Sequence, residues 1–169
     1  MIVLVGFMGA GKTTVGRLLA AEAGLPFADL DLAIESARSR SVQEIFAQDG
    51  EAAFRDIEHR TLAEVLAGPD LVLAAGGGAV EHPGSRRLLA AARVVYLQVG
   101  YAEALARVGG DTGRPMLARP DLEAVYRRRL AGYEEVATLT VPAGGRDAKA
   151  VCADVLAGLA GRPHARYPR

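Results

Sequence analysis

The 169-residue sequence predicts an α/β fold with three layers, in which a parallel β-sheet lies between two layers of helices. Five short apolar segments alternate along the chain with segments that show the helical spacing of apolar residues, the rhythm of strand–helix–strand units. The apolar segments are mostly hydrophobic without interruption, which is typical of strands buried on both faces. We expect residues 1–160 to form one domain and residues 161–169, which contain two prolines, to form a frayed tail.

The first half of the chain is expected to form two of the strands. Gly24 and Gly50 are interpreted as the ends of helices, and the pattern from Ser41 to Glu44 is a capping box that opens a helix. The strands are predicted at residues 2–5 and 26–31, and the helices at residues 12–23, from residue 32, at 42–48 and at 51–66.

The second half is expected to form the remaining three strands. These are predicted at residues 71–75, 93–98 and 139–141, and the helices at residues 85–92, 101–108, 121–136 and 147–159. Residues 109–120 are rich in glycine and proline and are predicted to form a loop.

Composition excludes several classes of protein. Lysine plus arginine and aspartate plus glutamate each number 20, so there is no bulk charge to attract nucleic acid or a membrane surface. The single cysteine, Cys152, rules out a disulfide within the chain and is interpreted as a packing residue. No segment has the roughly 20 apolar residues of a membrane span, and the apolar start is too short for a signal peptide. We expect a cytoplasmic protein, and a monomer because no coiled coil is evident.

The strongest motif lies between the first strand and the first helix. Residues 6–13 read Gly-Phe-Met-Gly-Ala-Gly-Lys-Thr, the complete G-x-x-x-x-G-K-[ST] phosphate loop, or P-loop. Its glycines let backbone N–H groups turn toward one phosphate chain, Lys12 can reach the β- and γ-phosphates, and the Thr13 hydroxyl can bind Mg²⁺. The motif predicts that the chain binds a nucleoside triphosphate, but switch proteins, motors, helicases and small-molecule kinases all share it.

Two acids lie at the carboxyl end of the second predicted strand. Asp29 and Asp31 are two residues apart, so on a strand they would face the same side and aim at one spot. One carboxylate could support Mg²⁺ through water while the other holds a hydroxyl or accepts its proton. The alternative is that Asp31 only caps the following helix.

Three further features point to an acceptor site or to a lid over the phosphates. Gly76, Gly77 and Gly78 follow the third strand, where backbone can approach a ligand closely or simply turn. Arg55 and Glu58 share one helix face, either as a guanidinium oriented for a carboxylate or as a surface ion pair. The 109–115 loop could be a lid that delivers an arginine to the phosphates, or a solvated loop.

Taken together, these motifs resemble the shikimate kinases. The phosphate loop, Asp-Leu-Asp, Phe-Arg-x-x-Glu, Gly-Gly-Gly-Ala-Val, Arg-Pro-Met-Leu and Arg-x-x-x-Tyr at residues 129–133 occur in the order and spacing of that family, over roughly residues 2 to 160. The resemblance implies a P-loop fold of the nucleoside monophosphate kinase type, with strand order 2-3-1-4-5 and a lid loop. It also implies transfer of the γ-phosphate of MgATP to the 3-hydroxyl of shikimate, in the biosynthesis of aromatic amino acids.

The resemblance further implies roles for individual residues. Catalysis would fall to Lys12, Asp31 and Arg114, and Mg²⁺ would be held by Thr13 and, through water, by Asp29. ATP would contact Gly9, Ala10, Gly11, Lys12, Thr13, Thr14, Arg107, Arg114 and Arg146. Shikimate would contact Asp31, Phe46, Phe54, Arg55, Gly76, Gly77, Gly78 and Arg129, with Glu58 orienting Arg55.

Two departures and two alternatives accompany the resemblance. The stretch between Arg114 and Arg129 is a few residues shorter than in family members, and Ala131 stands where they commonly have a proline. The alternatives are another small-molecule P-loop kinase, of the gluconate or nucleotide kinase kind, and an ATP-binding regulator without catalysis.

Overall fold

The computed structural model describes residues 1–109 and 115–161, and it contains the predicted five-stranded parallel sheet. The strand order is β2-β3-β1-β4-β5, as the family resemblance implies, and every neighbouring pair is parallel. The strands are β1 (Ile2–Val5), β2 (Phe27–Asp29), β3 (Val72–Ala74), β4 (Arg93–Gln98) and β5 (Leu139–Pro142). The three-layer α/β prediction is confirmed.

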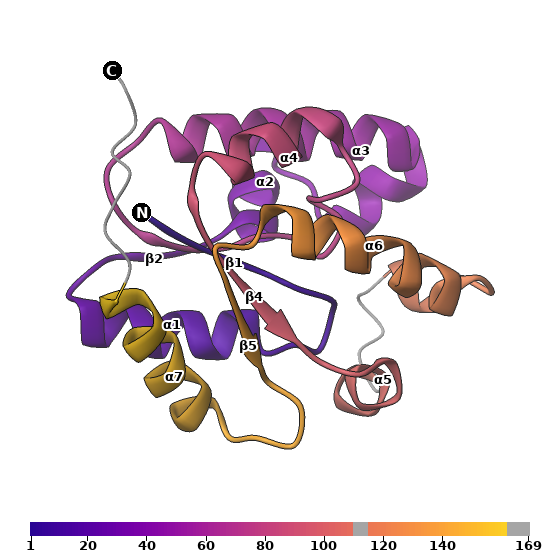
Figure 1. The fold of residues 1–169 in the computed structure, drawn as a ribbon. Helices are drawn as coiled ribbons and strands as arrows, with labels where there is room; N and C mark the ends of the chain where they lie inside the picture. Colours follow the sequence, from indigo (N-terminus) through magenta and orange to yellow (C-terminus); the bar gives the residue numbers. More distant parts are fainter. Residues whose placement is uncertain (110–114, 162–169) are drawn as a thin grey trace.

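Helices cover both faces of the sheet (Figure 1). Helices α1 and α7 pack against each other on one face, while α2, α3, α4 and α6 cover the other. The helices are α1 (Lys12–Ala23), α2 (Leu30–Arg38), α3 (Val42–Leu66), α4 (Pro83–Ala90), α5 (Tyr101–Val108), α6 (Leu122–Val136) and α7 (Ala148–Ala160), with a 3₁₀ turn η1 at Pro115–Ala118.

The second strand is shorter than predicted. It ends at Asp29 and α2 begins at Leu30, so Asp31 lies in the first turn of a helix and not on a strand. The prediction that Asp29 and Asp31 share a strand face was therefore wrong. The prediction that Asp31 could be the helix cap was also wrong, because Asp29 is the N-cap and its carboxylate accepts the Asp31 N–H at 3.1 Å.

The break predicted at Gly50 is a kink within one long helix. Gly50 has φ 82° and ψ 170°, values that a helix cannot continue through, yet α3 resumes directly after it. The capping box at the start of α3 is confirmed, since the Ser41 hydroxyl accepts the Glu44 N–H at 3.2 Å and the Glu44 carboxylate accepts the Ser41 N–H at 2.7 Å. The kink divides α3 between a short segment beside α2 and a longer one that carries Arg55 and Glu58.

The sheet is buried on both faces, and this fixes where the site can form. Val3, Leu4 and Val5 of the central strand have no exposed surface, and Cys152 is buried as predicted. Because all five strands are parallel, their carboxyl ends meet at one edge of the sheet, where open α/β folds bind ligands.

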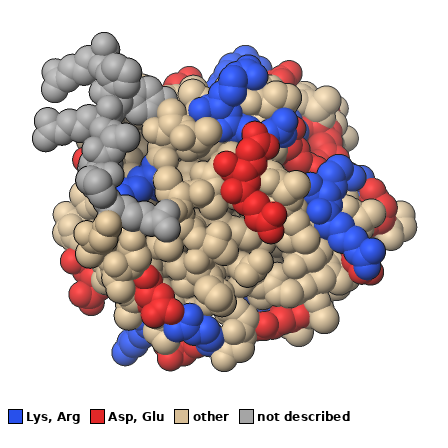
Figure 2. Space-filling view, viewed as in Figure 1, with Lys and Arg blue, Asp and Glu red and all other residues tan. Residues whose placement is uncertain are grey.

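Charges are mixed on the molecular surface. On the face shown in Figure 2, acidic and basic side chains are interspersed among uncharged residues, which agrees with the balanced composition. None of the helices in residues 1–109 and 115–161 is long and apolar enough to cross a membrane.

Candidate active site

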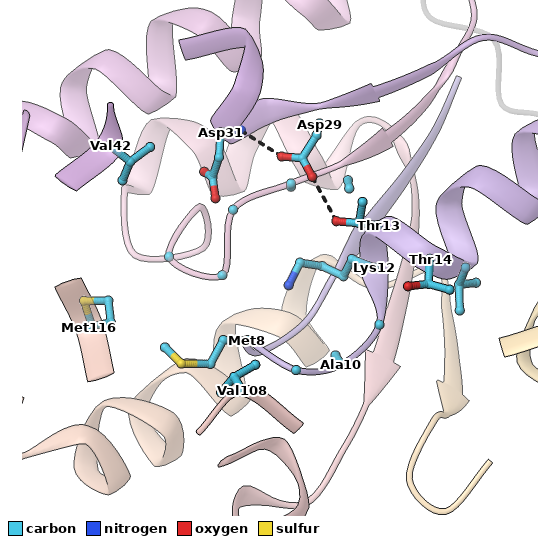
Figure 3. A pocket seen from close by; sticks show the side chains of 18 of the residues that line it. Met8, Ala10, Lys12, Thr13, Thr14, Asp29, Asp31, Val42, Val108 and Met116 are labelled. Carbon is cyan, nitrogen blue, oxygen red and sulfur yellow. Dashed lines mark hydrogen bonds between the residues drawn. The ribbon is translucent and has the colours of Figure 1, made fainter. Parts of the chain in front are cut away.

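A cavity of about 790 Å³ lies at the carboxyl edge of the sheet. It is lined by the loop after β1, by the residues that follow β2 and β3, and by parts of α3, α5, α6 and α7. Figure 3 shows one part of it, with Lys12, Thr13, Asp29 and Asp31 gathered around the same space. Segments far apart in the sequence therefore form one site.

The phosphate loop has the backbone that its glycines were expected to supply. Gly9 and Gly11 have φ of 75° and 88°, in the left-handed region that favours glycine. A Cβ on Gly9 would also lie 2.5 Å from the carbonyl oxygen of Ala104, so the loop can approach α5 only with glycine there. Lys12 extends across the loop and donates to the carbonyls of Gly6 and Phe7, at 2.8 and 3.1 Å.

The two aspartates point into the cavity in different ways. Asp29 accepts a hydrogen bond from the Thr13 hydroxyl at 2.9 Å, which joins the end of β2 to the start of α1. The Asp31 carboxylate extends from the first turn of α2 into the same cavity (Figure 3). The predicted gathering of both acids at the cavity holds, although a helix turn and not a strand face produces it.

The glycine turn after β3 consists of Gly76, Gly77 and Gly78, and two of these three positions have no room for a side chain. A Cβ on Gly76 would collide with the Glu58 carboxylate and lie 3.0 Å from Asp31, and one on Gly78 would collide with the Arg55 guanidinium. Gly77 has more room, with its nearest neighbours 3.6 Å away in the phosphate loop. The simple flexible turn considered as an alternative does not account for these close approaches.

Arg55 and Glu58 form a buried pair and not the surface pair that their spacing also allowed. Glu58 is 1% exposed and Arg55 11%, and the Nη1 to Oε2 distance is 2.7 Å. Burial raises the pKa of Glu58, and this effect outweighs the opposing attraction of Arg55. Phe46 and Phe54 lie under the guanidinium, with Arg55 Cζ 5.7 and 5.2 Å from their ring centroids, close enough for cation–π attraction.

Arg129 approaches the same end of the cavity from α6. It is 2% exposed, and its Nη2 lies 2.6 Å from Oε2 of Glu81. Its Nη1 lies 3.7 Å from the position that a Cβ would take on Gly77. One helical turn later, the Tyr133 hydroxyl donates to the carbonyl of Gly77, so α6 is fixed to the glycine turn.

Glu81 connects the two arginines. Burial would raise the pKa of Glu81, but hydrogen bonding to Arg129 and the charges of Arg129 and Arg55 lower it overall, so this carboxylate is ionised. Its Oε2 lies 3.4 Å from Arg55 Nη2, and its Oε1 lies 3.2 Å from Arg128 Nη2.

The other end of the cavity carries two of the remaining predicted arginines. Arg107 donates to the carbonyls of Gly9 and Ala143, at 3.1 and 2.9 Å, and Arg146 to the carbonyl of Pro142 at 3.1 Å. Arg114, predicted as the lid arginine, lies outside the described residues. The other predicted site residues all line the cavity: Gly9, Ala10, Gly11, Lys12, Thr13, Thr14, Asp29, Asp31, Phe46, Phe54, Arg55, Gly76, Gly77, Gly78, Arg107, Arg129 and Arg146.

Sequence reasoning missed two carboxylates of this site. Glu81 and Glu51 both contact Arg55, and Glu51 also pairs with Arg119 at 2.6 Å. Glu51 precedes Arg55 by one helical turn, so its contact was available from the sequence. No spacing in the sequence indicated the contact of Glu81, because its partner Arg129 is 48 residues away.

The phosphate loop on a five-stranded parallel sheet, with an acceptor pocket beside it, defines a P-loop phosphotransferase. The shikimate kinase family model matches residues 8–160. A shikimate kinase of Mycobacterium bovis is 46% identical over 161 residues, which are 93% of this chain and 92% of the relative. One of Thermobifida fusca is 49% identical over 144 residues, 83% of this chain and 84% of the relative.

Solved structures agree with the sequence relatives. A shikimate kinase from Acinetobacter baumannii in complex with shikimate superposes with a TM-score of 0.89 at 37% identity, covering 94% of this chain and 92% of that one. A gluconokinase from Sinorhizobium meliloti has a TM-score of 0.60 at 21% identity over 94% and 90% of the two chains, a likeness of fold alone. The chain belongs to the shikimate kinase family, and it is an ATP-dependent kinase.

Proposed function

We propose that this protein transfers the γ-phosphate of ATP to the 3-hydroxyl of shikimate, giving shikimate 3-phosphate and ADP for the biosynthesis of aromatic amino acids. Membership of the family and the neighbouring structure that holds shikimate support the reaction. The observation that carries the assignment within this chain is that Arg55 lies against Gly78 and Arg129 beside Gly77, in the same cavity as the phosphate loop.

Shikimate fits this end of the cavity by its chemistry. It carries one carboxylate and three hydroxyl groups, and two guanidinium groups meet at Glu81. Three buried polar side-chain atoms have no hydrogen-bond partner among the described residues. They are Nε of Arg55, Nε of Arg129 and Oε1 of Glu58, which pairs with Arg55. Buried polar atoms are normally satisfied. The two Nε–H groups can donate to an anionic group and the Glu58 oxygen can accept from a hydroxyl, so these atoms support a ligand that carries both.

ATP and Mg²⁺ would occupy the opposite end. The loop from Gly9 to Thr14 would surround the phosphates, and Arg107 and Arg146 would flank the adenine. Thr13 and Asp29 supply the oxygen ligands that Mg²⁺ prefers, and they already lie 2.9 Å apart, so they fit the ion. Thr13 would bind it directly and Asp29 through water. Bound Mg²⁺ would neutralise charge on the phosphates during transfer.

The protein's own part is to position the substrates and balance their charge. Asp31 would hold the 3-hydroxyl and accept its proton as the oxygen attacks the γ-phosphate. Lys12 would neutralise the charge that develops on the transferring group, with Arg114 closing from the lid. Arg55 and Arg129 would fix the carboxylate, with Phe46 and Phe54 as the pocket wall and Glu58 orienting Arg55. Such positioning supplies most of the catalysis in phosphoryl transfer.

A panel of acceptors tests the proposal. ADP release by the purified protein is followed with shikimate, gluconate or a nucleoside monophosphate as acceptor, with and without Mg²⁺. We expect release that depends on both shikimate and Mg²⁺. Turnover with gluconate or a nucleotide instead would assign the pocket to another small-molecule kinase, and no ADP release with any acceptor would favour an ATP-binding regulator.

We also propose that the enzyme works as a monomer in the cytoplasm. The substrate pocket is formed within one chain, and ATP is a cytoplasmic metabolite. Light scattering after size-exclusion chromatography tests the monomer, since a larger mass at assay concentration would contradict it.

A further inference from the structure

The two arginines proposed to hold shikimate share one internal carboxylate. Oε2 of Glu81 lies 2.6 Å from Arg129 Nη2 and 3.4 Å from Arg55 Nη2. Two guanidinium groups at such close quarters repel each other, and a carboxylate oxygen between them removes that repulsion. Glu81 therefore stabilises the arrangement in which both arginines face the same end of the cavity.

The backbone of Glu81 is fixed independently of these contacts. Its N–H donates to the carbonyl of Gly78 at 2.8 Å, which places it in a turn continuous with the glycine turn. Arg86 in α4 donates to the carbonyl of Val80 at 2.8 Å. The carboxylate, 19% exposed, thus projects from a held position between α3 and α6.

Arg129 depends on Glu81 more than Arg55 does. Arg55 also pairs with Glu58 and Glu51, at 2.7 and 3.2 Å. For Arg129, Glu81 is the only carboxylate within 4.0 Å in residues 1–109 and 115–161. Since Arg129 is almost fully buried, removal of Glu81 leaves a buried charge without its counter-ion, and the guanidinium must shift to find solvent or another acceptor.

We propose that Glu81 is a positioning residue for the shikimate carboxylate, which holds Arg129 and Arg55 as a pair and so sets the affinity for the acceptor. The inference rests on the proposed shikimate kinase activity. Binding of Arg129 Nη2 to Glu81 leaves Nη1 beside Gly77, where the acceptor would lie. The negative charge of Glu81 would weakly oppose a second carboxylate, but Arg128 at 3.2 Å shares that charge, so we expect the loss of positioning to dominate.

Two substitutions separate the charge of Glu81 from its hydrogen bond. Glu81→Ala removes both, and Glu81→Gln keeps an oxygen that can accept from Arg129. The matched control is Glu123→Gln, because Glu123 pairs with Arg127 on the exposed face of α6, outside the cavity. Steady-state ADP release gives KM for shikimate, KM for ATP and kcat, and thermal unfolding checks that each variant folds.

We expect Glu81→Ala to raise KM for shikimate about 10-fold or more, because it weakens a contact that is equally strong in the substrate complex and in the transition state. The kcat and KM for ATP should stay within about 2-fold of the parent enzyme. Glu81→Gln should show a smaller rise in KM for shikimate, and it decides the question if the alanine variant does not fold. Glu123→Gln should match the parent.

An unchanged or lowered KM for shikimate in a folded Glu81 variant overturns the inference. So does a fall in kcat as large as the fall in kcat/KM, since that would place Glu81 in the chemical step. These results differ from failure of the proposed function, in which the parent enzyme itself shows no ADP release with shikimate.

Discussion

Substitution of Gly78 by alanine should impair shikimate use without affecting ATP. A Cβ at this position would lie well within 3.0 Å of the Cζ and both terminal nitrogens of Arg55, whereas non-bonded carbon atoms prefer about 3.5–4.0 Å. The guanidinium must therefore retreat by about 1 Å or more, although Glu58 and Glu51 hold it at 2.7 and 3.2 Å. A misplacement of about 1 Å in a substrate-positioning group can cost about 100-fold in rate.

We therefore expect kcat/KM for shikimate to fall about 100-fold in Gly78→Ala, with KM for ATP within about 2-fold of the parent enzyme. ADP release at varied shikimate and at varied ATP measures both. Gly161→Ala is the matched control, because that glycine has φ −82° and none of the residues that the structure describes lies within 4 Å of an added Cβ. A folded Gly78→Ala enzyme with the parent's KM and kcat for shikimate would refute the placement of Arg55 at the substrate.

Three further predictions follow from the site and its surroundings. Arg55→Ala should raise KM for shikimate about 10- to 100-fold, because the ion pair between the guanidinium and the shikimate carboxylate is already present in the enzyme–substrate complex. An unchanged KM would place the carboxylate elsewhere. Tyr133→Phe should lower the free energy of unfolding by about 1–3 kcal/mol in urea titrations, since the Gly77 carbonyl loses its donor; a change near zero would contradict this. Burial lowers the pKa of His59, and the charges of His82 and Arg87 lower it further, so the unfolded chain binds a proton more readily. The free energy of unfolding should therefore decrease as pH drops below about 6.5, less steeply in His59→Gln, and equal slopes would count against the shift.

The sequence predicted the layers of the fold because local patterns determine them. Short, mostly apolar segments marked all five strands to within two residues at either end, and the capping box at Ser41 marked the start of α3. The strand order came from the family resemblance and not from these patterns, since pairing between distant segments leaves no local trace. The boundary after β2 was misjudged because Asp29 can end a strand and cap a helix equally well.

The site was predictable where it follows a motif and not where it depends on packing. The phosphate loop and the glycine turn carry backbone requirements that only glycine meets, and these are visible in the sequence. The burial of the Arg55–Glu58 pair was not visible, because spacing on a helix does not say which face is covered. The bridge from Glu81 to Arg129 joins residues 48 apart, and only the docking of α6 on the glycine turn brings them together.

The most direct test of the proposed chemistry is the turnover of Asp31→Asn with saturating MgATP and shikimate. Its side chain keeps nearly the same shape but cannot accept the proton of the attacking hydroxyl. We expect kcat to fall about 100-fold or more, the scale of general-base catalysis, while the affinity for ATP stays within about 2-fold. Turnover close to that of the parent enzyme would contradict the claim that Asp31 activates the acceptor in this cavity.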